Sequence, residues 1–260
     1  MSQTDRTNRF AEPHPQLFDH PAAAPVAQPS IGANGRLPSY IKDHRKRLRD
    51  RFLTGGADAL PDYELLELVL FRAIPRQDVK PLARRLLDQF TDFNGVLSAP
   101  LAQLRAFHGI GDAVICELKI VEAAAHRLAR SRVIDRPVLG GWDALVDYCH
   151  TKLAHLPNEE FRTLFLDRKN RLIADECLAK GTVDHVPVYP REIVKRALEL
   201  NATAIILVHN HPSGDPTPSN ADITMTQSIE QAASALDITL HDHLIIGKQT
   251  EISFRASGLI

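Results

Sequence analysis

The second half of the sequence alternates short apolar runs with segments of helical period, and this alternation constrains the fold more than any other feature. Two alternating apolar runs over 161–178, joined at Lys169-Asn170, predict a β-hairpin. Helices are expected over 142–155, 189–200 and 220–236, and buried strands over 202–209 and 238–247. Strands that alternate with helices indicate an α/β domain, which we place at 137–260.

The first half has a helical texture without strand signals. Residues 36–132 predict a compact all-α module with short connections, and 131–141 is expected to be a linker because Pro and Gly flank an Asp-Arg pair. The helices are expected over 39–53, 60–74, 78–90, 99–107 and 112–132. Residues 1–35, rich in Pro, Ala, Gln and Ser, are expected to form a disordered tail.

Charge differs between the two halves although the net charge is only −1. Residues 36–132 carry 17 Lys and Arg against 12 Asp and Glu, whereas residues 133–260 carry 12 against 17. This asymmetry suggests two modules with different partners. No apolar run reaches the roughly 20 residues of a membrane span and no secretory signal is visible, so we expect no membrane partner. The 3 widely spaced cysteines fit a reducing compartment, and we expect a cytoplasmic protein.

The stretch "HNHPSGDPTPSNAD" (209–222) follows the expected strand at 202–209 directly. On an extended backbone His209 and His211 point to the same side, and Asp222 lies in the first turn of the next helix. Two imidazoles and one carboxylate leave one tetrahedral position open, which is the composition of a catalytic zinc site. Ser219 and Asp222 also satisfy the S-x-x-[DE] pattern of a helix capping box, which needs no metal. From local chemistry both interpretations stay open.

The same stretch resembles the H-x-H-x(7)-S-x-x-D signature of JAMM (MPN-type) metalloproteases, with every spacing met. The longer segment from "FLDRKNRLIADECL" to "HDHLIIG" resembles the bacterial RadC family over nearly all of 137–260, and the helical module resembles the N-terminal part of that family. The resemblance implies an α/β (α+β) MPN/JAMM-like domain with a mixed sheet and flanking helices.

The resemblance also implies roles for the matched residues. His209, His211 and Asp222 are expected to bind one Zn²⁺ per chain, and Ser219 to support the oxyanion. JAMM enzymes use a glutamate ahead of the first core strand as general acid/base. Glu159 and Glu160 are both candidates here, and the E-x-F arrangement of RadC proteins favours Glu159 over a merely solvated carboxylate.

A zinc-dependent, metallopeptidase-like hydrolase that attacks an amide or isopeptide bond of an unknown protein or peptide is therefore the leading expectation. The alternative is a factor associated with DNA repair or recombination, in which the zinc is structural or acts on a phosphodiester.

Two further groups of polar residues stand near this region in the sequence. "HDH" at 241–243 puts His241 and His243 on one strand face, with Asp242 opposite, and a buried hydrogen-bonded Asp242-His243 pair is favoured over a second metal site. The loop with Asp184, His185 and Arg191 is a candidate groove lining, and a structural salt bridge explains Arg191 equally well.

Two features of the helical module suggest weak, non-specific contact with DNA. "LRAFHGIGDAVICEL" resembles a helix-hairpin-helix, whose turn at Gly109 and Gly111 can receive a phosphate on backbone N–H groups. Asp112 and Ile115 depart from that motif, and a tight turn between two helices is the alternative. Lys42, Arg45 and Arg49 share a helical face that can follow a phosphate backbone, or can be an ordinary solvated face.

Overall fold

The computed structural model describes residues 39–181 and 188–260, which fall in a compact unit that spans Leu37–Ile260. The tail expected over 1–35 lies outside these ranges, as do Asp184 and His185. Within the described ranges, no helix combines the length and apolar character that crossing a bilayer requires.

Helices make up the described part of the first half, as expected. They are α1 (Ser39–Gly55), the 3-10 turn η1 (Ala57–Ala59), α2 (Asp62–Ala73), α3 (Lys80–Phe90), α4 (Phe93–Ser98), α5 (Leu101–Ala106) and α6 (Asp112–Val133). Fully buried leucines from four of these helices form one core, namely Leu66, Leu70, Leu86, Leu104 and Leu118. The sequence did not predict α4, which begins where Asp92 accepts a hydrogen bond from the backbone N–H of Gly95 at 2.7 Å.

The second half forms the domain that carries the site. Its elements are η2 (Val138–Gly140), α7 (Trp142–Leu153), β1 (Glu160–Leu166), β2 (Leu172–Lys180), α8 (Pro190–Glu199), β3 (Ala204–Asn210), α9 (Asn220–Ser234), β4 (Thr239–Ile246) and β5 (Glu251–Ser253). The predicted hairpin is present, and its turn places Asn170 at a left-handed φ of 54°. The three-residue β5 is too short to show a period and was not predicted.

The strands form one mixed sheet in the order β2-β1-β3-β4-β5. β1 runs antiparallel to β2 and β3, whereas β3 and β4 are parallel and are joined through α9. Every residue of β1 and β3 is buried, as expected for central strands that are covered on both faces. The register pairs Phe161 with His209, which brings the start of β1 to the end of β3.

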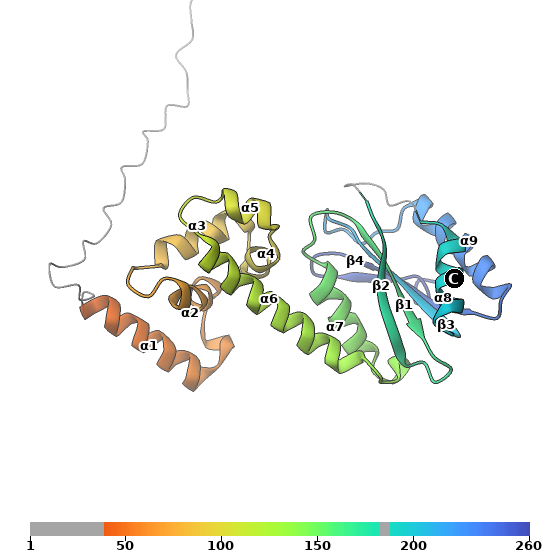
Figure 1. The fold of residues 1–260 in the computed structure, drawn as a ribbon, viewed down its shortest axis with the longest axis horizontal. Coiled ribbons are helices and arrows are strands. Elements are labelled where there is room, and N and C mark those ends of the chain that lie inside the picture. Colours follow the sequence, from red (N-terminus) through yellow and green to blue (C-terminus); the bar gives the residue numbers. More distant parts are fainter. Residues whose placement is uncertain (1–38, 182–187) are drawn as a thin grey trace, which may run out of the picture. The chain divides into compact units, whose positions relative to one another are not determined.

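Helices cover the two faces of this sheet separately (Figure 1). Buried side chains of α7, such as Leu145 and Leu153, pack with Leu164 and Val208 on one face. Residues of α8 and α9 cover the other face, together with Phe161. The mixed sheet with flanking helices that the resemblance implied is confirmed.

The segment 131–141, expected to be a linker, is held by two buried valines, while most of its other described side chains are exposed. Val133 and Val138 are each only 3% exposed and belong to the core beside α7. Ile134 forms a bridge with Leu172 at the edge of the hairpin.

β4 contains an irregularity that changes which of its side chains share a face. The register passes from Leu240 directly to Asp242, so His241 is the extra residue of a β-bulge. Leu240 and His243 consequently face α9, whereas Nε2 of His241 lies 2.7 Å from Oδ1 of Asn170 in the hairpin turn. The prediction that His241 and His243 share a face is therefore wrong, because a bulge shifts the strand period by one residue.

Candidate metal centre

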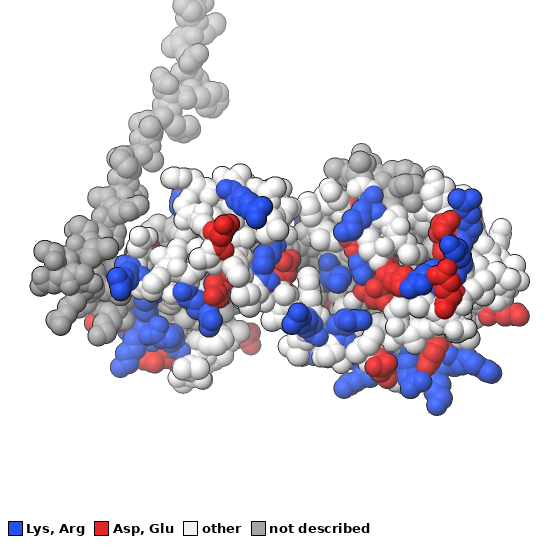
Figure 2. Space-filling view, viewed as in Figure 1, with Lys and Arg blue, Asp and Glu red and all other residues white. Residues whose placement is uncertain are grey.

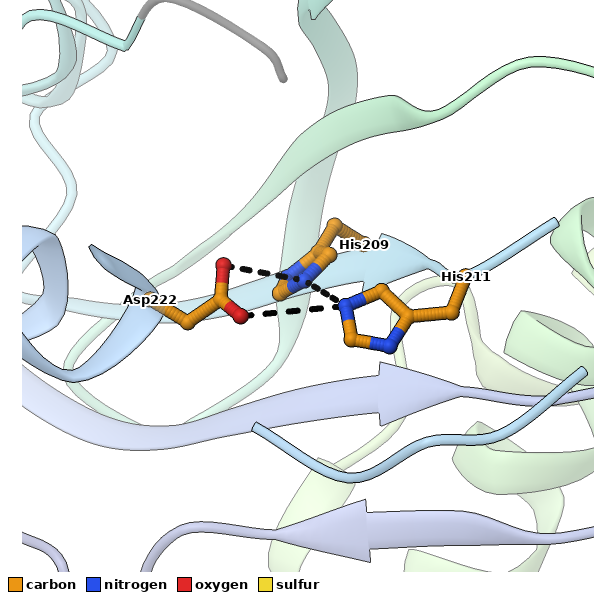
Figure 3. Close-up of side chains that lie close together, drawn as sticks. All are labelled: His209, His211 and Asp222. Atoms are coloured by element: carbon orange, nitrogen blue, oxygen red, sulfur yellow. Dashed lines mark hydrogen bonds and ion pairs between the residues drawn. The ribbon is translucent and has the colours of Figure 1, made fainter. Parts of the chain in front are cut away.

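Two histidines and one aspartate converge where β3 ends and α9 begins (Figure 3). Nε2 of His209 lies 3.1 Å from Nε2 of His211 and 3.4 Å from Oδ1 of Asp222. Nε2 of His211 lies 3.7 Å from Oδ2 of Asp222. One potential ligand atom of each residue lies within 4.8 Å of the others. The structure thus places together the three side chains that the resemblance implied as ligands.

The donor set of this cluster fits zinc. Nδ1 of His211 lies 2.8 Å from the carbonyl oxygen of Asp215, and because a carbonyl can only accept, this nitrogen carries the proton of the neutral ring. Nε2 of His211 is then the lone-pair nitrogen, and it faces His209 and the carboxylate of Asp222. Two imidazole nitrogens and one carboxylate oxygen are three ligands of the kind zinc takes, with a fourth position left open.

Asp222 is at once a helix cap and a member of the cluster. Ser219 is the N-cap of α9, and both halves of a capping box are present. Oδ2 of Asp222 accepts hydrogen bonds from the backbone N–H of Ser219 at 2.8 Å and from the Ser219 hydroxyl at 2.6 Å. Oδ1 is the oxygen nearer to His209. The capping box therefore orients the carboxylate, and the two interpretations that the sequence left open are compatible.

Burial and hydrogen bonding set the protonation of the cluster. Burial lowers the pKa of His209 to about 4, although the charge of Asp222 opposes this shift. The hydrogen bond to Asp222 raises the pKa of His211. Burial favours a higher pKa for Asp222, but hydrogen bonds with His211 and Ser219 outweigh burial and hold its pKa well below the usual range. Near neutral pH Asp222 is therefore a carboxylate and His209 a neutral ring, the forms in which these two residues bind a cation, whereas the raised pKa of His211 means that a proton competes with the cation there.

The two candidate general bases have different surroundings. Oε1 of Glu159 lies 3.8 Å from Nε2 of His209, so this carboxylate borders the cluster. Glu160 forms ion pairs with Arg162 and, at 3.3 Å, with Lys180. The geometry favours Glu159 as the candidate, because its carboxylate borders one of the three converging side chains, whereas that of Glu160 is engaged by two cations.

Asn210, between the two histidines, holds the backbone on both sides of Glu159. Its Oδ1 accepts from the backbone N–H of Glu160 at 2.9 Å, and its Nδ2 donates to the carbonyl oxygen of Asn158 at 3.1 Å. The side chain is 1% exposed. Sequence reasoning placed Asn210 only on the face opposite the histidines. Its contacts depend on the β1–β3 pairing, for which the sequence carries no local signal.

His243 and Thr226 contact the cluster, and sequence reasoning gave neither a role in it. Nε2 of His243 lies 2.8 Å from Nδ1 of His209, and Nδ1 of His243 lies 2.6 Å from Oγ1 of Thr226. Burial lowers the pKa of His243 well below the ordinary value. The neighbouring Asp242 instead accepts from the backbone N–H groups of His243 and Arg255, at 2.7 and 2.9 Å.

A turn connects two helices at Gly109 and Gly111, where the sequence resembles a helix-hairpin-helix. α5 and α6 flank it, Gly109 has a φ of 98°, and Gly111 is the N-cap of α6. A Cβ at position 109 would lie 2.9 Å from a guanidinium nitrogen of Arg85, so this exposed turn has a cation beside it.

The prediction that Arg45 lies on an exposed basic face is wrong. Its side chain is 7% exposed, and one guanidinium nitrogen donates to the carbonyl oxygens of Ile74 and Gln77 at 2.6 and 2.7 Å. The guanidinium also lies 4.2 Å from the ring centroid of Phe71. Helical spacing placed Arg45 correctly on α1, but that face of the helix packs on the loop after α2 rather than on solvent.

The two other residues of the expected basic face are Lys42 and Arg49. Arg49 is exposed, the backbone of Lys42 lies in α1, and the side chain of Lys42 is outside the described set. Basic side chains gather over α1 in Figure 2, with acidic residues between them. Arg191, the described member of the candidate groove loop, is exposed, pairs with Glu192 at 3.2 Å and stacks 5.8 Å from the Tyr189 ring.

Comparison with known proteins assigns this fold to a class. A family model of the RadC-like JAB domain matches residues 139–259, and a model of the UPF0758 N-terminal region matches residues 41–116. The second half is thus a RadC-like JAB domain.

Close relatives extend this agreement over most of the chain. A UPF0758 protein of Ruegeria pomeroyi is 70% identical over 224 residues, which cover 86% of this chain and 100% of the relative. A UPF0758 protein of Rhodobacter capsulatus is 73% identical over 213 residues, which cover 82% of this chain and 100% of the relative. The chain belongs to the RadC (UPF0758) family, and the resemblance found in the sequence is confirmed.

Proposed function

We propose that this RadC-family protein is a zinc-dependent hydrolase that cleaves an amide or isopeptide bond. One observation carries the proposal: two imidazole Nε2 atoms and a carboxylate converge at a buried strand end, with a second carboxylate 3.8 Å from one of those nitrogens. A purely structural cluster of four such groups has no need of the second carboxylate. A hydrolytic site does need it, because a proton must move during attack and departure.

His209, His211 and Asp222 would hold the metal. When bound there, zinc would supply Lewis-acid polarisation and lower the pKa of water at the open coordination position from about 15.7 to about 7. Glu159 would accept the proton of the attacking water and return it to the leaving nitrogen, since its carboxylate borders His209. The hydrogen bonds of the Asn210 side chain to the backbone of Asn158 and Glu160 would keep that carboxylate in place.

Ser219 would donate a hydrogen bond to the developing oxyanion. Its hydroxyl proton is engaged with Oδ2 of Asp222 at 2.6 Å, so this role requires an exchange of partners. Oδ2 would keep the backbone N–H of Ser219 as a donor during that exchange, so Asp222 would remain oriented.

The experiment compares Glu159→Gln with Glu160→Gln in zinc content and in hydrolysis of isopeptide-linked, peptide and DNA substrates. We expect about one zinc per chain in both variants, loss of turnover in Glu159→Gln, and retention of turnover in Glu160→Gln, whose amide can still bond Arg162. Turnover that survives Glu159→Gln would refute the role of this carboxylate. Hydrolysis of DNA alone would favour the alternative, a phosphodiesterase or repair-associated factor.

We further propose that the helical module makes weak, non-specific contacts with DNA. Two exposed features support this proposal: the turn at Gly109 and Gly111, with Arg85 beside it, and the side chain of Arg49. Arg45 is not part of the proposal because it is buried. Binding to a short duplex should fall steeply as salt rises and should not depend on sequence. Equal binding of Arg49→Gln and the unaltered chain at low salt would argue against a contact by α1.

A cytoplasmic location is part of the same proposal, because Cys116, Cys149 and Cys177 are all free thiols.

A further inference from the structure

A chain of short hydrogen bonds runs from the backbone of α9 to His209. The hydroxyl of Thr226 donates to the carbonyl oxygen of Asp222 at 2.6 Å, and its oxygen lies 2.6 Å from Nδ1 of His243. Nε2 of His243 in turn lies 2.8 Å from Nδ1 of His209. The remaining ring nitrogen of His209, Nε2, faces His211 and Asp222.

The carbonyl oxygen of Asp222, at one end of these hydrogen bonds, determines where the protons lie. A carbonyl oxygen can only accept, and a hydroxyl has a single proton, so Thr226 can only accept from His243. Nδ1 of the neutral His243 ring therefore carries its proton, and its Nε2 accepts from Nδ1–H of His209. A neutral His209 with its proton on Nδ1 has its lone pair on Nε2, the atom that faces the other two ligands.

The surroundings reinforce this assignment. Thr226, His243 and His209 are each 0% exposed. The His243 ring packs between the rings of Phe161 and Phe254, at centroid distances of 5.8 and 4.5 Å. In such an apolar enclosure a ring nitrogen that lost its partner would remain unsatisfied, so this series of hydrogen bonds resists a change of tautomer.

We propose that Thr226 and His243 are positioning residues that hold His209 in the Nδ1-protonated tautomer, with Nε2 ready for the metal. The proposal rests on the metal-dependent function proposed above. It adds that Asp222 on α9 acts on the centre in two ways. Its carboxylate would bind the metal, and its backbone carbonyl oxygen anchors the hydrogen-bond relay formed by Thr226, His243 and His209. Partners of this kind around a metal ligand typically change metal affinity by 10–100-fold when they are removed.

Thr226→Val tests the relay, with Thr224→Val as a matched control. Both threonines lie on α9 and donate to a carbonyl four residues earlier, but Thr224 is exposed and bonds Asn220 at 2.9 Å. Valine keeps the shape and removes the hydroxyl. Zinc affinity, measured by competition with a chromogenic chelator, should fall about 10–100-fold in Thr226→Val and stay unchanged in Thr224→Val. Thr226→Ser, which restores a hydroxyl, should recover most of the affinity.

Nuclear magnetic resonance of ¹⁵N-labelled histidines in the metal-free protein supplies an independent readout. The unaltered chain and Thr224→Val should show His209 protonated at Nδ1, whereas Thr226→Val should show a mixture of tautomers. His209 protonated at Nε2 in the unaltered chain would overturn the proposal, as would unchanged zinc affinity in Thr226→Val. Failure of the unaltered chain to bind zinc would instead count against the proposed function, while the tautomer measurement would still decide the relay.

Discussion

Ser219 and Asp222 share one capping box, yet they should respond differently to substitution. Ser219→Ala removes the hydroxyl that accepts from the backbone N–H of Asp222 at 3.2 Å and donates to Oδ2 at 2.6 Å. Loss of an N-cap costs about 1 kcal/mol, within a range of about 0.5–2. For a unit of this size, that change lowers the melting temperature by about 2–4 °C. Asp222 keeps its carboxylate, so zinc should still bind.

Asp222→Asn should give a different pattern. An asparagine oxygen can still accept from the backbone N–H of Ser219, so the helix cap should persist, while the metal-free melting temperature should fall because the carboxylate that the folded chain stabilises is lost. The negative charge that faces His209 and His211 is lost, and zinc binding with it. In the unaltered chain, zinc at a hundredfold excess over its dissociation constant adds about 2.7 kcal/mol, which is a rise of about 5–11 °C.

Scanning calorimetry of both variants, with a chelator and with zinc, measures these effects. Without zinc, Ser219→Ala should melt lower than the unaltered chain and keep the zinc-dependent rise, whereas Asp222→Asn should lose the rise. A zinc-dependent rise that persists in Asp222→Asn would refute the assignment of Asp222 as a ligand. Loss of the rise in Ser219→Ala would show that the cap and the metal site cannot be separated in this way.

Three further predictions concern buried charge. In the metal-free protein, burial depresses the pKa of His209 to about 4, below the ordinary 6.5 of the unfolded chain, so stability is lost as pH falls from about 6.5 towards 4. In urea denaturation, the loss of stability between pH 7 and pH 5 should be about 2 kcal/mol larger in the unaltered chain than in His209→Ala, and an equal loss in both would contradict this prediction. Arg45→Ala should cost about 2–3 kcal/mol in the same assay because the carbonyl oxygens of Ile74 and Gln77 lose the buried guanidinium that they share as a donor, and Arg49→Ala less than about 0.5 kcal/mol. Arg162→Ala leaves the carboxylates of Glu160 and Asp175 without their buried cation, and a loss of about 3–5 kcal/mol is expected, so a nearly neutral effect would show that the network is hydrated.

The cluster of candidate ligands could be predicted from the sequence because its geometry is local. His209, His211, Ser219 and Asp222 lie within one stretch of chain that contains a strand end, a turn and a helix start. Strand alternation directs the histidines, and the capping pattern directs the carboxylate. The same local periodicities predicted most helices and strands of the second half, including the hairpin turn at Asn170.

The partners of those ligands could not be predicted in this way. His243 reaches His209 only through the parallel pairing of β3 with β4, and the β-bulge at His241 decides which face of the strand it occupies. Arg45 illustrates the same limit, since the period of α1 cannot distinguish solvent from the loop that covers one side of the helix.

The fold class, the positions of the candidate ligands and the family could be read from the amino-acid sequence, because they follow from periodicity, spacing and motif within short stretches of chain. Three features became visible only in the tertiary structure. The carboxylate of Asp222 both caps α9 and faces His209, and Glu159 rather than Glu160 borders His209. His243 contacts His209 and is itself bonded to Thr226. The physical reason is that hydrogen bonds and ion pairs depend on distances of about 3 Å between groups far apart in the chain. Strand register and helix packing set those distances, and no local pattern encodes them.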